Sequence, residues 1–215
     1  VLSRGCRRPK SPLLAASELF ALGDFQLYAK GDHATLTSAS LIETFYPLRT
    51  DYDRLSVGTY LLNLAEAAAQ PGENCRELFL LLLHTLSRLT FSDQPWKPLT
   101  AGFLLHYAAL EGFKPRLQHC VRCGRRLTDS DRVAFDLVEG GLCHVACPDP
   151  TVPIRAPERP AVPVAPEQVR WLNRSLECGA SGWVNEDTCY APFILLKDFV
   201  ERRIDRNLKS SHMLP

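Results

Sequence analysis

Two close pairs of cysteines constrain this chain more than any other feature. Cys120 and Cys123 are separated by two residues, Cys143 and Cys147 by three, and nineteen residues lie between the pairs. Thiolates with such spacing form tetrahedral zinc sites, so the sequence predicts one Zn²⁺ bound by all four. Because four thiolates leave no open coordination position, we expect the ion to stabilise a small lobe rather than to activate water.

Three alternatives remain open for these cysteines. In the first, the four cysteines form two disulfides, which a cytosolic redox poise disfavours. In the second, they are unliganded buried thiols. His119 and His144 flank the predicted ligands, so an imidazole that replaces one thiolate is the third alternative. The remaining cysteines have no metal-ligand spacing and are expected to be ordinary thiols: Cys6, Cys75, Cys178 and Cys189.

Length and composition indicate a globular protein. The chain has 215 residues, and 46% of them are apolar, which is enough for an ordinary core. The longest apolar stretch, residues 78–83, is far shorter than a membrane span, and no charged-then-apolar leader opens the sequence. We therefore expect a cytoplasmic protein that does not enter the membrane.

The distribution of charge is more informative than the net charge of +1. Residues 1–12 hold four basic side chains and no acidic one, and residues 114–132 hold six basic side chains against two acidic ones. Residues 18–93, in contrast, hold ten acidic and five basic side chains. Two basic segments therefore flank an acidic one, and each basic segment is either a phosphate-binding surface or merely a solvated face.

The hydrophobic pattern predicts five segments. Short strands are expected in residues 1–37, a helical body in 38–115, a zinc-binding module in 116–150, a proline-rich connector in 151–166, and C-terminal helices that pack on the helical body in 167–215. Cap and stop residues predict helices over 39–48, from 52 to a point before Pro71, over 75–90 and over 99–111; two more are expected over 167–177 and roughly 191–208.

Catalytic motifs are missing from the sequence. It has no glycine-rich phosphate loop ending in Gly-Lys-Ser/Thr and no Gly-x-Ser-x-Gly elbow. A zinc deaminase requires a His-x-Glu or Cys-x-Glu element upstream of a Pro-Cys-x2-Cys pair, and here His119, not a proline, precedes Cys120. We therefore expect no enzymatic activity.

Three strings, in this order along the chain, resemble segments of one known protein family. Residues 4–13 are similar to that family's Arg-Gly-Ala-Arg-Arg-Pro-Lys-Ser segment. Residues 110–115, followed by Cys120-x2-Cys123-Gly124, are similar to its Leu-Gly-Tyr-x-Pro and Cys-x2-Cys-Gly strings. Residues 199–214 resemble its closing helix and Leu-Lys-Ser end. The chain therefore resembles the RecO family of bacterial DNA-repair proteins, and the resemblance extends over essentially the whole chain.

The resemblance implies an α+β protein with an N-terminal OB-fold β-barrel, a central helical bundle and an inserted zinc module with four cysteine ligands. The OB-fold has about five strands, and this chain opens inside what would be the third. Roughly 20–30 upstream residues are therefore expected, and the barrel is incomplete in this chain.

The function implied by the resemblance is that of a recombination mediator. Such a protein binds single-stranded and double-stranded DNA, anneals complementary strands without ATP and is associated with the nucleoid. Together with RecR, it helps to load RecA onto DNA coated by the single-strand-binding protein, whose C-terminal tail is a further partner. The competing hypothesis is a zinc-stabilised protein–protein adaptor that does not contact DNA. Adaptor binding would lack the steep salt dependence that phosphate contacts impose.

The candidate DNA-binding residues are mostly arginines. Tyr28 and Lys30 share one face of a predicted strand, where a tyrosine beside a lysine is suited to stack a base, although an ordinary amphipathic strand has the same pattern. The basic candidates are Arg4, Arg7, Arg8 and Lys10 in the first basic segment, Arg125 and Arg126 in the second, and Arg202 and Arg203 near the C-terminus.

Overall fold

The computed structural model describes residues 6, 8, 10–11, 13–31, 33–70, 72, 74–146, 161–182, 191–204 and 208–215. The chain divides into two compact units, Val1–Tyr52 and Asp53–Pro215. Helices dominate the second unit, and small antiparallel sheets occur in both units. The predicted α+β class is confirmed.

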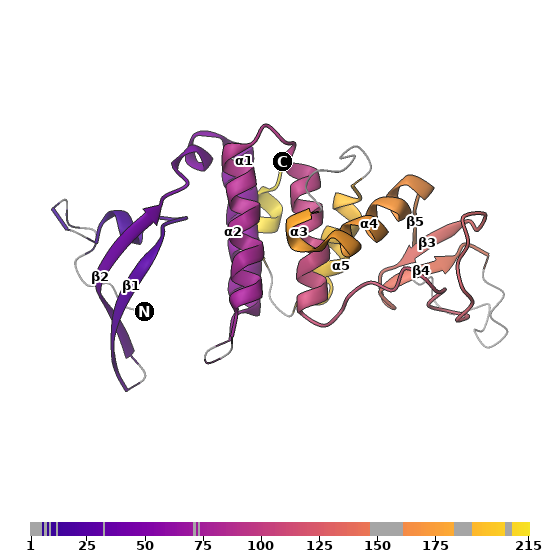
Figure 1. Ribbon diagram of the computed structural model, residues 1–215, viewed down its shortest axis with the longest axis horizontal. Helices are drawn as coiled ribbons and strands as arrows, with labels where there is room; N and C mark the ends of the chain where they lie inside the picture. The colour runs from indigo at the N-terminus through magenta and orange to yellow at the C-terminus, as the bar shows by residue number, and fades with distance from the viewer. Residues whose placement is uncertain are drawn as a thin grey trace. The chain divides into compact units, whose positions relative to one another are not determined.

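The first unit contains a long antiparallel hairpin (Figure 1). Strand β1 (Leu22–Lys30) pairs with β2 (His33–Glu43), and Gly31 in the turn has a φ of +58°, which favours glycine. The register shifts by one residue after Gln26, as in a β-bulge. Within the described residues these two strands form an open sheet and not a closed barrel, so the OB-fold stays a prediction.

The helix predicted over residues 39–48 is wrong. These residues continue β2 to Glu43, and a short 3₁₀ helix, η2 (Tyr46–Thr50), follows. Ser38, expected to cap that helix, instead donates its hydroxyl to Gln26 Oε1 across the hairpin at 2.6 Å. Cross-strand pairing therefore outweighs the local capping signal. A second 3₁₀ turn, η1 (Ala15–Ser17), precedes the hairpin.

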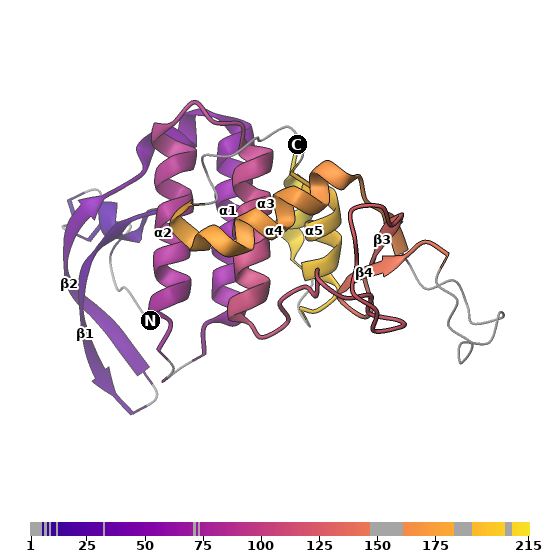
Figure 2. The ribbon, with the colours of Figure 1, turned by 45° about the vertical axis from the view of Figure 1, so that its right-hand side comes forward.

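Three helices form the centre of the second unit. Helices α1 (Tyr52–Ala68), α2 (Arg76–Phe91) and α3 (Trp96–Leu110) lie side by side in Figures 1 and 2. Each was expected near these positions from its apolar spacing and cap residues. Their shared core is built from large, fully buried side chains: Tyr60, Leu61, Leu64, Leu81, Leu89, Leu99, Phe103, Leu104 and Tyr107.

Two of the predicted helix boundaries have the expected chemistry. Asn74 Oδ1 accepts a hydrogen bond from the Arg76 N–H at 3.1 Å at the start of α2. At the end of α3, Gly112 has a φ of +83°, and the Phe113 N–H donates to the Ala108 carbonyl at 2.9 Å. This is a Schellman cap, and it turns the chain out of the helix toward the cysteine pair.

The two C-terminal helices lie against α3. Helix α4 (Pro166–Gly182) crosses it, as Figure 2 shows, and α5 (Phe193–Glu201) also contacts it. Buried Leu172 and Phe199 belong to the covering faces. Helix α5 is shorter than predicted, since the chain turns after Glu201 and a 3₁₀ segment, η5 (Lys209–Met213), lies near the C-terminus.

A three-stranded sheet forms the core of the remaining lobe. Strand β3 (Val133–Asp136) lies between β4 (Gly141–His144) and β5 (Ala161–Pro163), and all neighbours are antiparallel. The ring of Phe135 in β3 meets the ring of Phe199 in α5 edge-on, with 5.1 Å between the ring centroids. The ring centroids of Phe199 and Phe113 are 5.8 Å apart. These aromatic contacts attach the lobe to the helical body.

Candidate functional site

The cysteine pair Cys120 and Cys123 lies on a tight turn between α3 and β3. The Gly124 N–H donates to the Cys120 carbonyl at 2.9 Å, and the Cys120 N–H donates to the Arg125 carbonyl at 2.8 Å. Gly124 has a φ of +73°, a backbone conformation that is strained for any residue with a side chain. The turn is therefore a knuckle, defined here as residues 118–127, with both thiols on it.

Strand β4 brings His144 to this knuckle. The Sγ atoms of Cys120 and Cys123 and a ring nitrogen of His144 lie within 4.8 Å of one another. Cys123 Sγ is 3.5 Å from His144 Nδ1. A tetrahedral zinc ion, with Zn–S near 2.3 Å and Zn–N near 2.0–2.1 Å, separates a sulfur and a nitrogen ligand by about 3.5 Å. The three side chains therefore fit a metal ion.

The structure assembles the four predicted ligands only in part. Cys143 neighbours His144 on β4, so the two side chains point to opposite faces of the sheet. Cys143 is fully buried and packs with Cys120 and Ala134. It does not belong to the group that could hold an ion. Cys147 lies outside the described residues.

The two buried thiols differ in their protonation. Although burial raises it, the backbone N–H groups of Cys123, His144 and Arg122 lower the pKa of the Cys120 thiol to about 6. Burial raises the pKa of Cys143 to about 11. Near neutral pH, Cys120 is therefore a thiolate suited to a metal, and Cys143 is a thiol.

An ion pair between partly exposed Arg122 and fully buried Asp136 links the knuckle to β3. Arg122, between the two ligand cysteines, donates to Asp136 Oδ2 from Nε at 3.0 Å and from Nη2 at 2.8 Å. The Asp136 side chain is fully buried, and its Oδ1 accepts from the N–H groups of Val138 and Glu139 at 3.0 Å each. The sequence analysis missed Asp136, although a carboxylate at the end of an apolar strand was a usable signal.

The predicted DNA-binding residues of the second unit fall into two groups. Arg125 and Arg126 lie on the knuckle with exposed side chains, and neither makes an ion pair within the part of the chain that the structure describes. Arg202 is paired with Asp198 at 2.9 Å. Arg203 donates to the carbonyls of Leu137 and Val138 at 2.8 Å each and stacks on Phe199, so it holds the lobe to α5.

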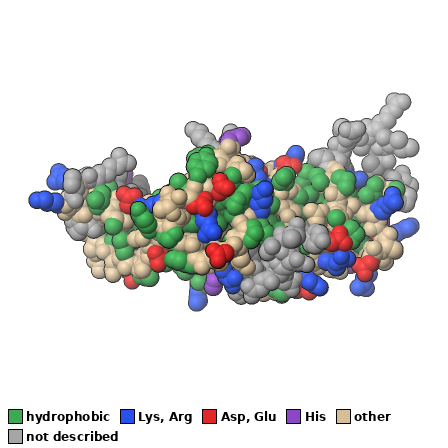
Figure 3. Space-filling view, turned by 90° about the horizontal axis from the view of Figure 1, so that it is seen from above, with side chains coloured by type: hydrophobic (Ala, Val, Ile, Leu, Met, Phe, Trp, Pro, Cys, Tyr) green, Lys and Arg blue, Asp and Glu red, His purple; other side chains and the backbone are tan. Residues whose placement is uncertain are grey.

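Figure 3 shows Lys and Arg side chains at the end of the second unit where β3 and β4 lie, interleaved with acidic ones. In the first unit, Arg8 and Lys10 are exposed, as are Tyr28 and Lys30 on β1. Arg4 and Arg7 lie outside the described residues. Exposed cations are thus present in both units, and those of the knuckle, Arg125 and Arg126, follow the cysteine pair in the chain.

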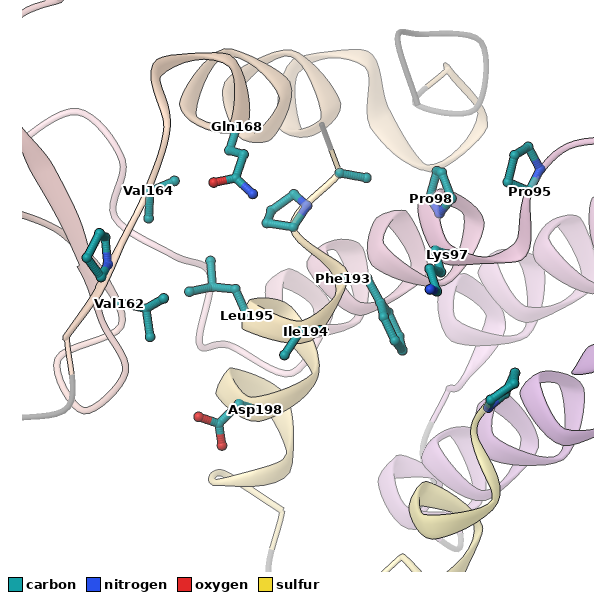
Figure 4. A pocket seen from close by; sticks show the side chains of 14 residues that line it. Pro95, Lys97, Pro98, Val162, Val164, Gln168, Phe193, Ile194, Leu195 and Asp198 are labelled. Carbon is teal, nitrogen blue, oxygen red and sulfur yellow. The ribbon is translucent and has the colours of Figure 1, made fainter. Parts of the chain in front are cut away.

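An apolar groove of about 680 Å³ opens where α3, α4, β5 and α5 meet (Figure 4). Of its two charged lining residues, Asp198 is paired with Arg202, whereas Lys97 lies over the Trp96 ring at 5.3 Å. Its apolar lining is formed by Pro95, Pro98, Val162, Pro163, Val164, Pro192, Phe193, Ile194 and Leu195. The groove therefore suits an apolar ligand that carries a negative charge.

Comparison with known proteins decides the family. A family profile described as "Recombination protein O C terminal" matches residues 49–212, more than half of the chain. The chain belongs to the RecO family. The match includes all five α-helices of the described residues and the lobe that carries the knuckle, and it confirms the resemblance to the RecO family.

Several RecO proteins are similar to this chain. The DNA repair protein RecO of Alkaliphilus metalliredigens is 37% identical over 144 residues, which cover 66% of this chain and 58% of that relative. The protein of Symbiobacterium thermophilum is 32% identical over 149 residues, which cover 69% and 59%. The protein of Desulforamulus reducens is 24% identical over 214 residues, which cover 100% and 81%. The chain thus spans less than two thirds of the first two relatives.

Among the described helices, none is long and apolar enough to cross a bilayer.

Proposed function

We propose that this chain is a DNA-binding recombination mediator of DNA repair. In this proposal it anneals complementary strands and, with RecR, helps to load RecA onto DNA coated by the single-strand-binding protein. The observation that carries the proposal is the pair Arg125 and Arg126, exposed on a knuckle within a family-matched lobe. The proposed activity is non-enzymatic and takes place at the nucleoid in the cytoplasm.

Annealing requires a surface that neutralises two phosphate backbones and leaves the base edges free to pair. The guanidinium groups of Arg125 and Arg126 suit this task, because they bind phosphate oxygens without regard to sequence. Arg122 and Arg203 are excluded from it in our proposal, because a buried carboxylate and backbone carbonyls occupy their donors. Arg202, paired with Asp198 on the surface, is a weaker contributor.

The proposal includes a structural Zn²⁺ ion. Cys120, Cys123 and His144 would hold it, and Cys147, which follows His144 at the same spacing that separates the first two cysteines, would complete the tetrahedron. The ion would supply no catalysis. It would keep the knuckle folded, and with it the two arginines.

We also propose that the hairpin of β1 and β2 belongs to an OB-fold. Phe25, Leu27 and Tyr28 are at least 40% exposed on this hairpin. A lone hairpin is marginally stable in water, so further strands are needed to cover such side chains. Tyr28 and Lys30, with Arg8 and Lys10 before β1, would then contribute a single-strand contact.

The experiment is the annealing of two complementary oligonucleotides by the full chain. Replacing Arg125 and Arg126 by Ala is expected to lower the slope of log affinity against log salt by roughly 0.7–0.9 for each lost phosphate contact. Annealing is expected to fall more steeply than single-strand binding, because it uses two backbones. Binding is measured by fluorescence anisotropy and pairing by stopped flow, with and without ATP.

The matched control removes two arginines that are already paired with carboxylates. Arg116 lies 3.7 Å from Glu139, and Arg170 lies 2.9 Å from Glu167. Their double Ala variant has the same net charge as the knuckle variant and is expected to keep most of the annealing rate. Equal activity of both variants would contradict the proposed role of Arg125 and Arg126 and favour the adaptor hypothesis. Annealing that requires ATP would contradict the non-enzymatic mechanism.

We assign the apolar groove to the C-terminal tail of the single-strand-binding protein. Lys97 supplies a cation for a carboxylate, and the proline-rich walls supply an apolar surface. The Pro163 nitrogen has no proton to donate, so the groove is expected to bind side chains rather than add a strand to β5.

A labelled acidic peptide with an apolar, free C-terminus tests this assignment. Lys97→Glu is expected to weaken its binding by about tenfold or more, because one charge-assisted contact is replaced by repulsion. Ile194→Glu, at a 79% exposed position of the wall, is expected to act similarly without unfolding the chain. Lys114→Glu, an equal charge change outside the groove, is the control. If the Lys97 and Lys114 variants bind the peptide equally, the assignment is wrong.

A further inference from the structure

A carboxylate lies behind His144, on the side of the ring away from the cysteines. His144 Nδ1 is 3.5 Å from Cys123 Sγ, and Nε2 is 3.8 Å from Asp131 Oδ2. The imidazole therefore bridges a thiol and a carboxylate through its two nitrogens. At 3.8 Å the contact with Asp131 is electrostatic and is longer than a hydrogen bond.

The carboxylate of Asp131 is held in place by its own loop. The backbone N–H and the hydroxyl of Thr128 both donate to Asp131 Oδ2 at 2.8 Å. The Asp131 N–H in turn donates to the Thr128 carbonyl at 3.0 Å. Val145, next to His144, donates its N–H to the Arg132 carbonyl at 2.9 Å, which fixes the loop against β4. The carboxylate is thus oriented without help from the histidine.

We propose that Asp131 is a positioning residue that fixes Nδ1 of His144, rather than Nε2, as the atom that binds the metal. This inference rests on the proposed metal centre and is independent of DNA binding. An imidazole ligand must present a lone pair to the metal and carry its proton on the other nitrogen. A negative charge beside Nε2 favours the tautomer with the proton on that nitrogen, and this tautomer leaves the Nδ1 lone pair directed toward the thiols.

The pleat of β4 allows His144, and not Cys143, to join the two thiols of the knuckle. His144 and Cys143 are consecutive, so only one of them faces the Cys120 and Cys123 thiols from the outer side. Cys143 fills the interior against Ala134 and has no exposed surface. Exchanging the two would shift β4 by one residue and break its register with β3, in which Ala134 is opposite Cys143.

A cobalt titration of the full chain tests the proposal, because Co²⁺ occupies zinc sites and reports its ligands by absorption. Asp131→Asn is expected to lower Co²⁺ affinity by about tenfold or more, within the range measured for outer-shell partners of metal-bound histidines. Asp131→Glu is expected to restore part of the loss. Asp129→Asn, which changes an exposed carboxylate in the same loop, is the control and is expected to match the wild type.

Ligand identity has its own readout. His144→Ala is expected to abolish the wild-type cobalt spectrum, whereas Cys143→Ala is expected to keep both the spectrum and its thiolate-to-metal charge-transfer intensity. Nitrogen NMR of the zinc-loaded chain is expected to show His144 metallated at Nδ1 and protonated at Nε2, a signature that a histidine outside the metal centre would not produce.

The results distinguish the absence of a metal centre from a metal centre in which Asp131 has no role. A wild-type chain that takes up no cobalt would overturn the proposed metal centre together with this inference. Normal uptake with equal affinity in the Asp131→Asn and Asp129→Asn variants would overturn only the role of Asp131. Loss of the spectrum in Cys143→Ala and its retention in His144→Ala would restore the four-thiolate site predicted from the sequence.

Discussion

The Cys120→Ser variant is expected to lose the metal ion and to expose the amides of residues 116–146 to hydrogen exchange, while α1, α2 and α3 stay protected. Structural zinc contributes about 10–16 kcal/mol to the folding of small zinc-bound modules, so its loss removes most of the local stability. The lobe has little to replace it. Its strands contain three or four residues, and its interior is a small cluster around Cys120, Ala134 and Cys143.

The loss of protection is expected to be graded across the lobe. The knuckle, residues 118–127, depends directly on the ligands and should exchange fastest. Phe135 is anchored on Phe199 at 5.1 Å, so amides of β3 should keep part of their protection. Hydrogen exchange followed by mass spectrometry measures this gradient. The control is Cys178→Ser, a substitution of an exposed cysteine on α4. Unchanged protection throughout the lobe in Cys120→Ser would contradict a metal-dependent fold.

The Asp136→Ala variant is expected to destabilise the lobe by about 3–5 kcal/mol, the usual cost of breaking a buried ion pair. Arg122 would keep its charge without a carboxylate, and the N–H groups of Val138 and Glu139 would lose their acceptor. Urea denaturation followed by cobalt absorbance measures the loss. Glu139→Ala, which removes an exposed partner of Arg116 at 3.7 Å, is expected to cost about 0–1 kcal/mol.

The same ion pair is expected to affect acid stability. Burial raises the pKa of Asp136, but the Glu139 N–H, the Arg122 guanidinium and the Val138 N–H outweigh it and hold the pKa below its usual range. A lowered folded-state pKa contributes stability above the unfolded value near 3.9, and this contribution is lost as pH falls through the lowered pKa. The difference between wild type and Asp136→Ala should therefore persist to below about pH 4. A difference that disappears near neutral pH would show that Asp136 is not the partner of Arg122.

Local signals predicted the helical elements well where their caps and apolar spacing agreed. Asn74 and Gly112 mark boundaries whose hydrogen bonds involve residues close in sequence, so a short window contains the information. The failure at residues 39–48 has the opposite cause. Ser38 bonds to Gln26, twelve residues earlier, and a helix cap cannot be told from a cross-strand partner without the hairpin.

The sequence by itself determined the existence of a cysteine knuckle at Cys120 and Cys123, its place after α3 and the family to which the chain belongs. Only the tertiary structure decided which side chains join that knuckle, because the pleat of β4 turns His144 toward it and Cys143 into the core. It also decided which cations are already engaged by other groups of the described residues. Arg122, Arg125 and Arg203 have the same charge in the sequence, but Arg122 meets Asp136 and Arg203 meets the carbonyls of residues 137 and 138. Arg122 and Asp136 are 14 residues apart in the sequence, and Arg203 and Leu137 are 66 residues apart. Only folding brings such distant residues within hydrogen-bond distance of each other.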